Sequence, residues 1–376
     1  MIRELDGVLM MQMGSVSPRE LVKSSIVDPV FFAGLQAALT PLHLVPLPVA
    51  MGMARSFGRK FGGAKPNRVR VERAVDRLGI AMPELCDEER YDLVLRSYEH
   101  LAILAVEFVR TSRFLNDDGW ADFIEIGDLR KGMRPMIEDR PTLLLTGHCG
   151  NWEILGYTLA LLGFKIHALY RPLDFRPFDQ WARNTRSRRG LDLVDKFGAM
   201  RRMPELLTEN QSVAVVADQN AGARGLQVPF FGRLASTYKA IGLMAIQHNA
   251  KILVGNAARV FPAPDHASGV RYKIEVIDCI YPEDWADQPD PLFYITARYR
   301  RGIEQMIRKT PDQTLWMHRF WKSRPRHEKL NKPFPDKLRE KLLALPWMDE
   351  AQVQAVVEQS DRDRATLLRE GITEFR

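Results

Sequence analysis

Cysteine is scarce in this chain of 376 residues, which has only Cys86, Cys149 and Cys279. Three scattered cysteines argue against a disulfide scaffold and against a structural zinc site, and they fit a reducing compartment. With 45% hydrophobic and 27% charged residues, the composition also excludes wholesale disorder. A chain of this length can bury a large core, so we expect a globular protein that needs neither disulfides nor metals for stability.

We also expect no export signal, and the chain has no long uninterrupted apolar run. Glu4 and Asp6 stand where a signal peptide would have a basic start followed by an apolar segment. The most apolar stretch, residues 30–54, contains three prolines in its second half, so we expect a helix up to Thr40 in or against a membrane interface rather than a spanning helix. A basic cluster follows at once, as an anionic membrane surface favours: Arg55, Arg59, Lys60, Lys65, Arg68, Arg70 and Arg73. The alternative is a buried helix with a solvated basic flank.

Acidic residues are outnumbered by basic ones, 47 against 54, which gives a net charge of +7. This balance suits an anionic partner, such as an acidic protein or a lipid surface. The basic residues are dispersed and form no recognisable reading motif, so we do not expect nucleic acid to be the partner.

Short β-rich runs alternate with helical ones, which predicts an α/β fold with a mainly parallel, twisted sheet flanked by helices. A long helix is expected over residues 88–115. Expected strands cover residues 142–146, 165–170, 191–195 and 212–217, with helices at 152–162, 178–189 and 236–249, the last capped by Ser236 or Thr237. Residues 251–260 and 270–277 are expected to pair as a hairpin.

Three parts follow from these patterns and from the prolines near residue 333. Residues 1–87 are expected to be a helical, membrane-associating segment, residues 88–330 an α/β domain, and residues 331–376 a charged helical tail.

The most informative stretch runs from Leu143 to Glu153. An apolar strand ends at Gly147, His148 follows in the turn, and an apolar helix begins after Asn151, a good N-cap. In open α/β sheets, catalytic groups gather at the carboxyl ends of strands. Because Gly150 lets the chain turn back, we expect Glu153 to reach one ring nitrogen of His148 and leave the other free as a base. The alternative is a strand-ending histidine beside a glutamate placed by the helix dipole.

Other chemistries find little support in the sequence. It has no G-x-S-x-G elbow, H-E-x-x-H pair, Walker A loop or G-x-G-x-x-G motif. Cys149 is a weak candidate for a nucleophile, because adjacent residues diverge in a turn and buried cysteines are mostly inert. We expect no metal and no cofactor.

The stretch with His148 and Glu153 resembles the H-x-x-x-x-[DE] box of the late acyltransferases of lipid A biosynthesis, the lauroyl/myristoyl transferase group. Further segments, in order, are similar to those of the family over about residues 88–325. They are Tyr170-Arg-Pro172, Arg186-Ser-Arg188 with Gly190, Asp218-Gln219, Val228-Pro-Phe-Phe-Gly232, Ala235-Ser-Thr237, Trp316-Met-His-Arg319 and Trp321-Lys-Ser-Arg-Pro325. Phe320 departs from the family pattern, and residues after 336 match nothing in it.

The resemblance implies a glycerol-phosphate acyltransferase-like fold that moves a fatty acyl group from acyl carrier protein to a hydroxyl of a glycolipid. It places the reaction at the cytoplasmic face of the inner membrane, with the protein peripheral or anchored by its N-terminus. His148 then takes the proton of the hydroxyl, oriented by Glu153. The basic residues Arg319, Lys322, Arg324 and Arg326 are candidates for contact with the acidic carrier protein.

Several residues are candidates for substrate binding or for stabilising the oxyanion: Arg171, Arg186, Arg188, Asp218 and Asn151. Asp218 is expected to hold one of these arginines, and residues 228–232 form an apolar turn for an acyl chain or for plain core packing. The motifs leave the acceptor open, so a phosphatidylinositol mannoside, an ornithine lipid or a pigment-like lipid are alternatives to a lipid A precursor. A catalytically inactive, membrane-associated binding protein is a further alternative.

Overall fold

The computed structural model describes residues 30, 33–34, 37 and 40–375, and they fall into two units. The smaller unit comprises the described residues up to Val45 together with Pro172–Thr185, and it holds α4 (Pro41–Leu44) and most of α10 (Arg176–Ser187). Within it the backbone N–H of Leu173 donates to Asp179 Oδ1 at 2.7 Å. The larger unit, Pro46–Arg171 and Arg186–Arg376, carries the sheet and the candidate site.

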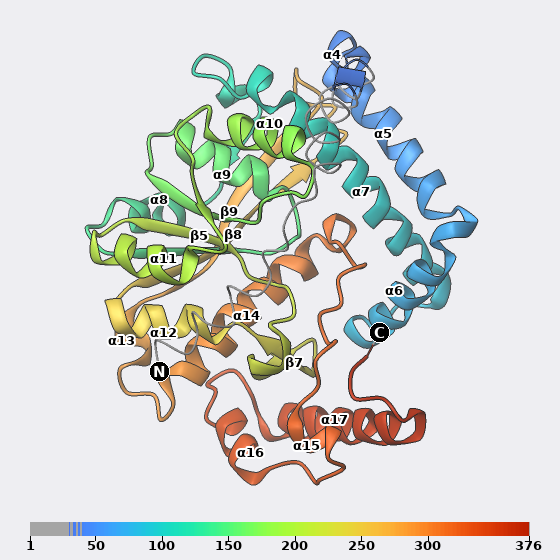
Figure 1. Ribbon diagram of the computed structural model, residues 1–376, viewed down its shortest axis with the longest axis vertical. Helices are drawn as coiled ribbons and strands as arrows, with labels where there is room; N and C mark the ends of the chain where they lie inside the picture. Colours follow the sequence, from blue (N-terminus) through green and yellow to red (C-terminus); the bar gives the residue numbers. More distant parts are fainter. Residues whose placement is uncertain (1–29, 31–32, 35–36, 38–39, 376) are drawn as a thin grey trace, which may run out of the picture. The chain divides into compact units, whose positions relative to one another are not determined.

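A seven-stranded sheet with the order β1-β9-β8-β2-β5-β3-β4 forms the centre of the larger unit (Figure 1). Neighbouring strands are parallel except for the antiparallel pair β8 and β9. The predicted mainly parallel α/β fold is therefore confirmed. The strands are β1 (Ile124–Ile126), β2 (Thr142–Thr146), β3 (Ile166–Tyr170), β4 (Asp192–Asp195), β5 (Ser212–Val216), β8 (Lys251–Val260) and β9 (Arg271–Ile280).

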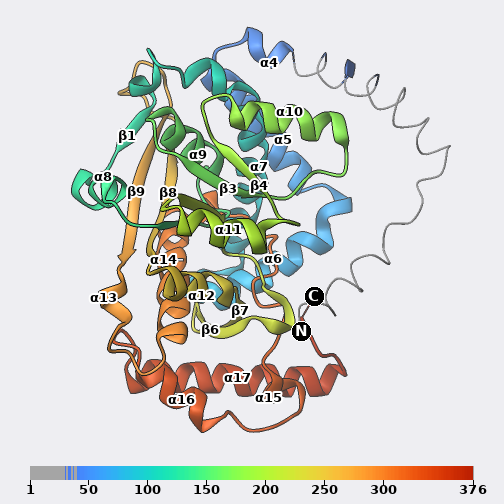
Figure 2. The same ribbon diagram turned by 60° about the vertical axis from the view of Figure 1, so that its left-hand side comes forward.

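Helices cover both faces of this sheet (Figures 1 and 2). The helix α9 lies on one face, and α11 and α12 lie on the other. The helices of the larger unit are α5 (Leu47–Gly62), α6 (Arg68–Ala81), α7 (Asp87–Phe114), α8 (Leu129–Ile137), α9 (Trp152–Leu161), α11 (Ala199–Thr208), α12 (Lys239–His248), α13 (Pro282–Trp285), α14 (Pro291–Lys309), α15 (Arg326–Lys329), α16 (Asp336–Leu343) and α17 (Glu350–Glu370). Short 3-10 helices span Lys65–Asn67, Trp120–Asp122, Gly222–Arg224 and Pro311–Gln313.

The elements predicted around β2 agree closely with the structure, because their apolar periodicity is strong. One prediction nearby is wrong: residues 236–237 do not cap a helix. Instead, β6 (Leu226–Phe230) and β7 (Arg233–Thr237) form a separate antiparallel hairpin, and α12 begins only after Tyr238. Ser236 and Thr237 at the end of β7 are fully buried, so tertiary pairing overrides the capping tendency of serine and threonine.

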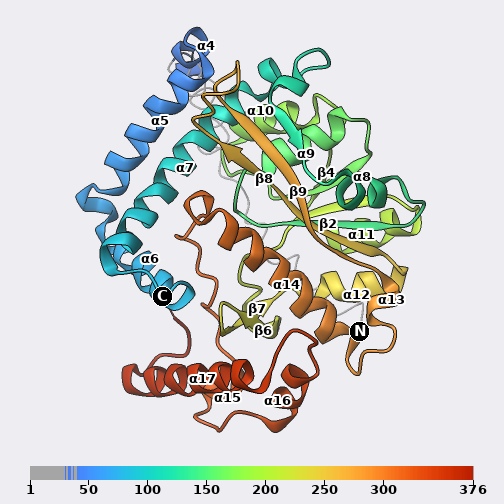
Figure 3. The same cartoon turned by 180° about the vertical axis from the view of Figure 1, so that it is seen from behind.

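The C-terminal segment packs against this hairpin, where α15, α16 and α17 lie side by side (Figure 3). Its apolar residues Leu342, Val353 and Val356 belong to the main hydrophobic core. A buried ion-pair network joins Arg324 to Glu328 and Asp363, and Arg233 also pairs with Asp363 at 2.7 Å. The charges of this segment thus include several that are paired inside the protein. The three-part domain division drawn from the sequence stays a prediction.

The apolar stretch at residues 30–54 lies partly outside the described residues. Its second half forms α4 and the start of α5, where Pro46 is the N-cap and Pro48 occupies the first turn. Proline is tolerated there because the first amides of a helix lack partners. The helix α5 begins despite these prolines and includes Arg55, Arg59 and Lys60 of the basic cluster. Among the described residues, no helix is long and apolar enough to span a membrane.

Candidate active site

Two neighbouring parallel strands bring His148 and Asp218 together. In the pairing of β2 with β5, Thr146 lies opposite Val216, and the N–H of Ala217 donates to the carbonyl of Thr146 at 2.8 Å. His148 and Asp218 each follow two residues after these paired strand ends. They therefore meet at the carboxyl edge of the sheet, where α/β folds place their ligands.

Both carboxylate oxygens of Asp218 face His148. Oδ1 lies 2.6 Å from His148 Nδ1, and Oδ2 accepts the backbone N–H of His148 at 2.8 Å. Asp218 is fully buried, whereas the His148 side chain is 19% exposed. Since a carboxylate accepts a proton from Nδ1, the contact leaves Nε2 of His148 as the nitrogen that can act as a base.

Burial and charge oppose each other in this pair. Burial lowers the pKa of His148, but the charge and hydrogen bond of Asp218, with a smaller contribution from the charge of Glu153, outweigh burial and raise it above the usual value. Burial raises the pKa of Asp218, but the charge and hydrogen bonds of His148 prevail and hold it well below its usual range. Asp218 is therefore ionised at neutral pH, as a partner of a catalytic imidazole must be.

The expected hydrogen bond between Glu153 and His148 is replaced by another arrangement. Both oxygens of Glu153 accept from Arg186, whose Nε and one terminal nitrogen donate at 2.8 and 2.6 Å. The planar fork of a guanidinium matches a carboxylate better than a single ring nitrogen does. Glu153 acts on His148 through its charge, while Asp218 holds the ring. Asp218 was expected to hold one of the arginines, and in the structure it holds His148 instead.

The loop that carries His148 is fixed by its backbone. The N–H of Gly150 donates to the carbonyl of Gln313 at 2.9 Å, and the N–H of Asn151 donates to that of Ala257 at 2.7 Å. Gly150 has a φ of 62°, and a Cβ at this position would lie 2.5 Å from the Ala257 oxygen. Only glycine fits here, because the conformation is left-handed and the neighbouring backbone leaves no room for a side chain.

Asn151 is the predicted N-cap of α9, but its side chain is too deeply buried to contact a substrate. Its Oδ1 accepts the N–H of Ile154 at 2.9 Å, its Nδ2 donates to Glu107 at 2.7 Å, and the residue is 1% exposed. The assignment of Asn151 to substrate binding is therefore not supported by its position, since both polar groups of the amide are engaged in holding the loop.

A buried carboxylate, Glu107 of α7, lies behind this loop. It pairs with both Nε and Nη2 of Arg259 and accepts the hydroxyl of Tyr272 at 2.6 Å. Burial lowers the pKa of Arg259, but the charge of Glu107 outweighs burial and raises it, so Arg259 remains charged. A satisfied buried network of this kind fixes one arrangement of the groups that it joins. Here it joins α7 and β8 to the start of α9.

Aromatic rings enclose the His148 imidazole. The rings of Trp152 and His318 lie 4.9 and 4.5 Å from it, both at steep angles. Burial lowers the pKa of His318 to about 4, helped by the charges of His148 and Arg77, although Asp218 opposes the shift. His318 is therefore neutral at pH 7, and it does not add a second positive charge when His148 is protonated.

His148, Asp218 and His318 each place one potential ligand atom within 4.8 Å of the others. Two histidines and one carboxylate are a set that divalent metals can accept. However, Nδ1 of His148 and Oδ1 of Asp218 are only 2.6 Å apart. Two ligands about 2 Å from a tetrahedral zinc lie farther apart than that. The contact is therefore a hydrogen bond, and a metal could take both of these atoms as ligands only by breaking it.

Arg300 of α14 contacts the backbone of Asp218. It is fully buried, its Nη1 donates to the Asp218 carbonyl at 2.6 Å, and its guanidinium lies 3.7 Å from the centre of the Phe230 ring. Burial lowers the pKa of Arg300 to about 10, against the attraction of Asp218, which leaves it charged at neutral pH. A cation on this side favours the ionised form of Asp218.

The three arginines expected to bind substrate lie in different places. Arg186 is held by Glu153, and its guanidinium carbon lies 5.2 Å from the centre of the Phe108 ring and 5.1 Å from that of Tyr170. Arg188 is exposed and donates to Ser112 at 3.0 Å, and Arg171 is exposed just after β3. Only Arg186 is linked through Glu153 to the surroundings of His148.

Two further expectations are decided by burial. Cys149 is fully buried, and burial strongly raises the pKa of its thiol, so it is not a thiolate nucleophile. In the segment 228–232, Val228 and Phe230 are fully buried and Phe231 is 4% exposed. This segment therefore packs in the core, as one of the two alternatives had it, and does not form an exposed turn.

The four basic residues near position 322 also differ in their surroundings. Arg324 is fully buried in the network with Glu328 and Asp363, so it cannot meet a carrier protein. Arg319 and Arg326 are exposed, and Lys322 is partly exposed beside Glu374. Three of the four thus remain on the surface.

Comparison with known sequences identifies the family. The sequence profile of the bacterial lipid A biosynthesis acyltransferases matches residues 25–323. The chain belongs to this family. It is 24% identical over 288 residues to a lipid A biosynthesis acyltransferase of Haemophilus influenzae, covering 75% of this chain and 86% of the relative. It is equally similar, over 285 residues, to the lipid A biosynthesis palmitoleoyltransferase of Escherichia coli and to a Shigella flexneri lipid A biosynthesis acyltransferase, covering 75% of this chain and 87% of each.

In this acyltransferase, sequence reasoning missed the partnership of His148 with Asp218, and it assigned no role to His318, Arg300 or Glu107. Asp218 stands at the end of a predicted strand, as His148 does, so strand adjacency would have paired them. Adjacency depends on sheet order, which periodicity does not give. Arg300 and Glu107 carry a weaker signal: each is a lone charge on the apolar face of a long helix.

Proposed function

We propose that this acyltransferase moves a fatty acyl group from an acyl carrier protein thioester to a hydroxyl of a lipid A precursor or similar glycolipid. The observation that carries the proposal is the contact between His148 and the fully buried, ionised Asp218 at the carboxyl edge of the sheet. Family membership and the names of the relatives support the acyl transfer and the lipid acceptor.

In the proposed reaction the acceptor hydroxyl attacks the thioester carbonyl while Nε2 of His148 takes its proton. Asp218 holds the Nδ1–H tautomer and stabilises the imidazolium that forms. The tetrahedral intermediate then collapses, the carbon–sulfur bond breaks, and the imidazolium returns the proton to the leaving thiolate. The ester forms, the carrier thiol is released, and no metal or redox group takes part in any step.

Glu153 and Arg186 have a different part in this proposal. Arg186, oriented by both oxygens of Glu153, supplies a positive charge for the oxyanion or for a phosphate of the acceptor. Arg171 and Arg188 are exposed and are proposed only as outer contacts for acceptor phosphates. Asp218 and Asn151, by contrast, act on the protein's own groups.

The donor and the location are proposed from charge. Arg319, Lys322 and Arg326 remain as surface cations for the acidic carrier protein, and an anionic membrane surface is proposed to bind the basic N-terminal region. The protein is accordingly proposed to work at the cytoplasmic face of the inner membrane, as a peripheral protein or with an N-terminal anchor.

The proposal is tested by incubating the protein with acyl carrier protein thioesters and lipid acceptors and weighing the lipids by mass spectrometry. Separate reactions contain a lipid A precursor, an ornithine lipid and a phosphatidylinositol mannoside, and His148→Ala provides the inactive control. A mass increase of one acyl group on the lipid A precursor, absent with the control, is expected. Acylation of another lipid alone would change the acceptor, and no acylation of any lipid would contradict the proposal.

The carrier-protein donor makes a separate prediction. KM for the carried thioester should rise with ionic strength, because exposed charges are screened over about 10 Å at 0.1 M salt. A KM that is independent of salt, or equal use of acyl-coenzyme A, would contradict a carrier-protein donor while leaving the acyl transfer in place.

A further inference from the structure

One side of α5 carries a row of exposed apolar side chains. Val49, Met53, Phe57 and Phe61 follow one another at intervals of four residues and are 50, 58, 66 and 50% exposed. Residues four apart lie on the same face of a helix. The rings of Phe57 and Phe61 lie 6.0 Å apart and nearly parallel. We call these four residues the α5 row. A row of this size in water is unusual unless something covers it.

The packing of α5 on α7 prevents the row from turning inward. The opposite side of α5 is buried against α7, which runs alongside it (Figure 3). A Cβ on Gly58 would lie 2.4 Å from the carbonyl oxygen of Tyr98, so the two helix backbones are in close contact there. The buried residues of α5 are Leu47, Ala50, Met51, Ala54, Gly58 and Gly62. Rotation of the helix would expose these residues and drive bulky side chains into α7.

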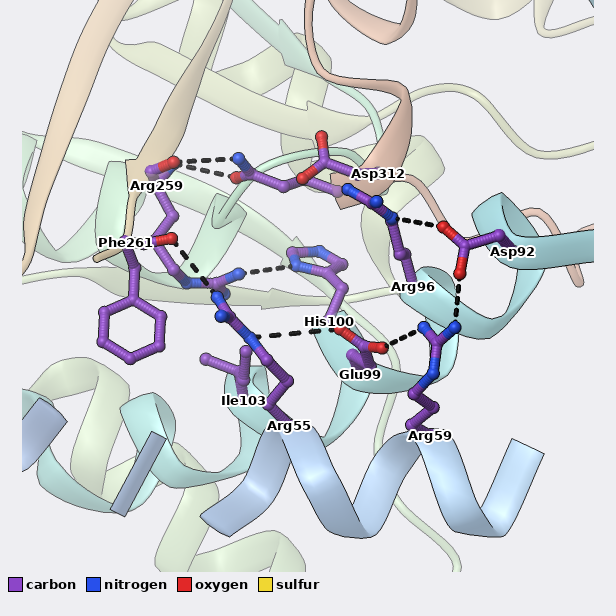
Figure 4. Close-up of a pocket in the computed structure, with 11 residues that line it drawn as sticks. Arg55, Arg59, Asp92, Arg96, Glu99, His100, Ile103, Arg259, Phe261 and Asp312 are labelled. Carbon is purple, nitrogen blue, oxygen red and sulfur yellow. Dashed lines mark hydrogen bonds and ion pairs between the residues drawn. The ribbon is translucent and has the colours of Figure 1, made fainter. Parts of the chain in front are cut away.

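A third side of α5 is tied to the protein by ion pairs. Figure 4 shows Arg55 and Arg59 extending from α5 into a cavity of about 410 Å³ beside α7. Arg59 pairs with Glu99 at 2.7 Å and also with Asp92, and Arg55 donates to the Phe261 carbonyl at 3.2 Å. These two arginines of the basic cluster are therefore engaged with the protein itself. They fix the helix and are not the cations that would meet a separate anionic surface.

The other cations of the cluster point outward. Between residues 60 and 73 there are five basic side chains against one acidic, Glu72. All five are exposed: Lys60, Lys65, Arg68, Arg70 and Arg73. Arg68 also pairs with Glu72 at 2.7 Å, but its side chain is 80% exposed, so this pair is open to solvent. Lys60 lies on α5 itself, on the side of the row, where a long side chain can keep its charge in water beside apolar neighbours. Exposed apolar residues flanked by cations match the two parts of an anionic bilayer, acyl chains below and phosphates above.

We infer that the α5 row is the face of this protein that inserts into an anionic lipid bilayer, with the five outward cations on its phosphates. This inference deepens the proposed membrane association by naming the surface, and it does not depend on the proposed chemistry. The helix lies flat in the interface, because only one of its sides is apolar and exposed while the other sides are held by α7 and by ion pairs.

The test measures partition of the full chain onto vesicles of phosphatidylglycerol and phosphatidylethanolamine by sedimentation. The variant Met53→Ser/Phe57→Ser removes the middle of the row. It should bind at least tenfold more weakly, while its unfolding temperature stays unchanged because both side chains are exposed. The matched control is Ile137→Ser/Leu368→Ser, which removes two apolar residues of 74 and 64% exposure from α8 and α17. The control should bind like the unaltered chain.

The outcomes separate this inference from the proposed association. If the unaltered chain binds and Met53→Ser/Phe57→Ser binds equally well, the row is not the inserting face, while membrane association stands. If the unaltered chain does not bind these vesicles at low salt, both fail. If the unaltered chain is a dimer in solution and the variant is a monomer, the row is covered by a second copy and the inference is wrong.

Discussion

Two carboxylates lie near His148, and they differ in burial and in hydrogen-bond partner. Asp218 is fully buried and gives both oxygens to residue 148, whereas Glu153 is 19% exposed and gives both oxygens to Arg186. Asp218 follows the adjacent strand β5, and Glu153 lies in the first turn of the following helix α9. The comparison teaches that closeness in sequence is a poor guide to a catalytic pair. A residue seventy positions away is placed by sheet register, while one five positions away is turned toward another partner.

The largest effect is expected from the residue that both carboxylates influence. Substituting His148→Ala should leave the fold intact and lower kcat/KM by roughly 100- to 10,000-fold, because positioned base catalysis is worth about that much. Steady-state kinetics with the acyl carrier thioester measure it, and an unchanged circular dichroism spectrum is the control. A loss of less than tenfold would mean that another group takes the proton.

Asp218→Asn is expected to come next, with a loss of at most about 10,000-fold. The amide that replaces the carboxylate can keep one acceptor but must present an N–H as well. The backbone N–H of His148 requires the acceptor, so the amide N–H faces Nδ1 and favours the tautomer with the proton on Nε2. That tautomer cannot accept a proton from the hydroxyl. Combining His148→Ala with Asp218→Asn should add little to the loss of His148→Ala, since the two act as one unit.

Glu153→Gln is expected to lower activity less than Asp218→Asn does, which tests the difference between the two carboxylates. It removes the charge that orients Arg186 without touching the hydrogen bond between Asp218 and His148. Because hydrogen bonds to charged groups are worth about 1.5 to 3 kcal/mol, we expect a loss of roughly 10- to 100-fold. The change should fall largely on KM for a phosphorylated acceptor. Arg186→Lys, which keeps the charge but not the fork, should give a similar KM. An effect confined to kcat would instead place Glu153 in proton transfer.

The smallest effect on activity is expected at Cys149. Its thiol is buried and protonated at neutral pH, so Cys149→Ala should retain most activity while lowering the free energy of unfolding by about 1 kcal/mol through lost packing. Urea denaturation measures the second quantity. A covalent acyl adduct at Cys149 in the absence of acceptor, detected as a mass shift, would overturn direct transfer to the hydroxyl.

Much of the frame around this site could be predicted from sequence, because strongly periodic segments fold locally. The strand before His148, the cap at Asn151 and the hairpin of β8 and β9 follow from apolar patterns and capping chemistry. The partner of His148 could not be predicted from these patterns, since it depends on which strands are neighbours. Likewise, Ser236 and Thr237 are good caps in isolation but are drawn into β7 by its pairing with β6.

The role of individual basic residues could be assigned only with the structure. Arg324 and Arg55 belong to basic clusters in the sequence, yet one is buried between two carboxylates and the other is bound to a backbone carbonyl. The sequence gives the sign of each charge but not its partner. Within these two clusters, the outward cations beyond residue 59 and the exposed ones near position 322 remain for external partners.

The most direct test of the central claim, that Asp218 rather than Glu153 orients His148, is the pH dependence of kcat/KM in Asp218→Asn and Glu153→Gln. His148 acts as a base only when neutral, and its raised pKa places the acid limb of the unaltered enzyme above the usual histidine value of about 6.5. Asp218 contributes more to that rise than Glu153. The account predicts that Asp218→Asn moves the acid limb to lower pH by clearly more than Glu153→Gln does. A larger displacement in Glu153→Gln, with Asp218→Asn unchanged, would contradict it.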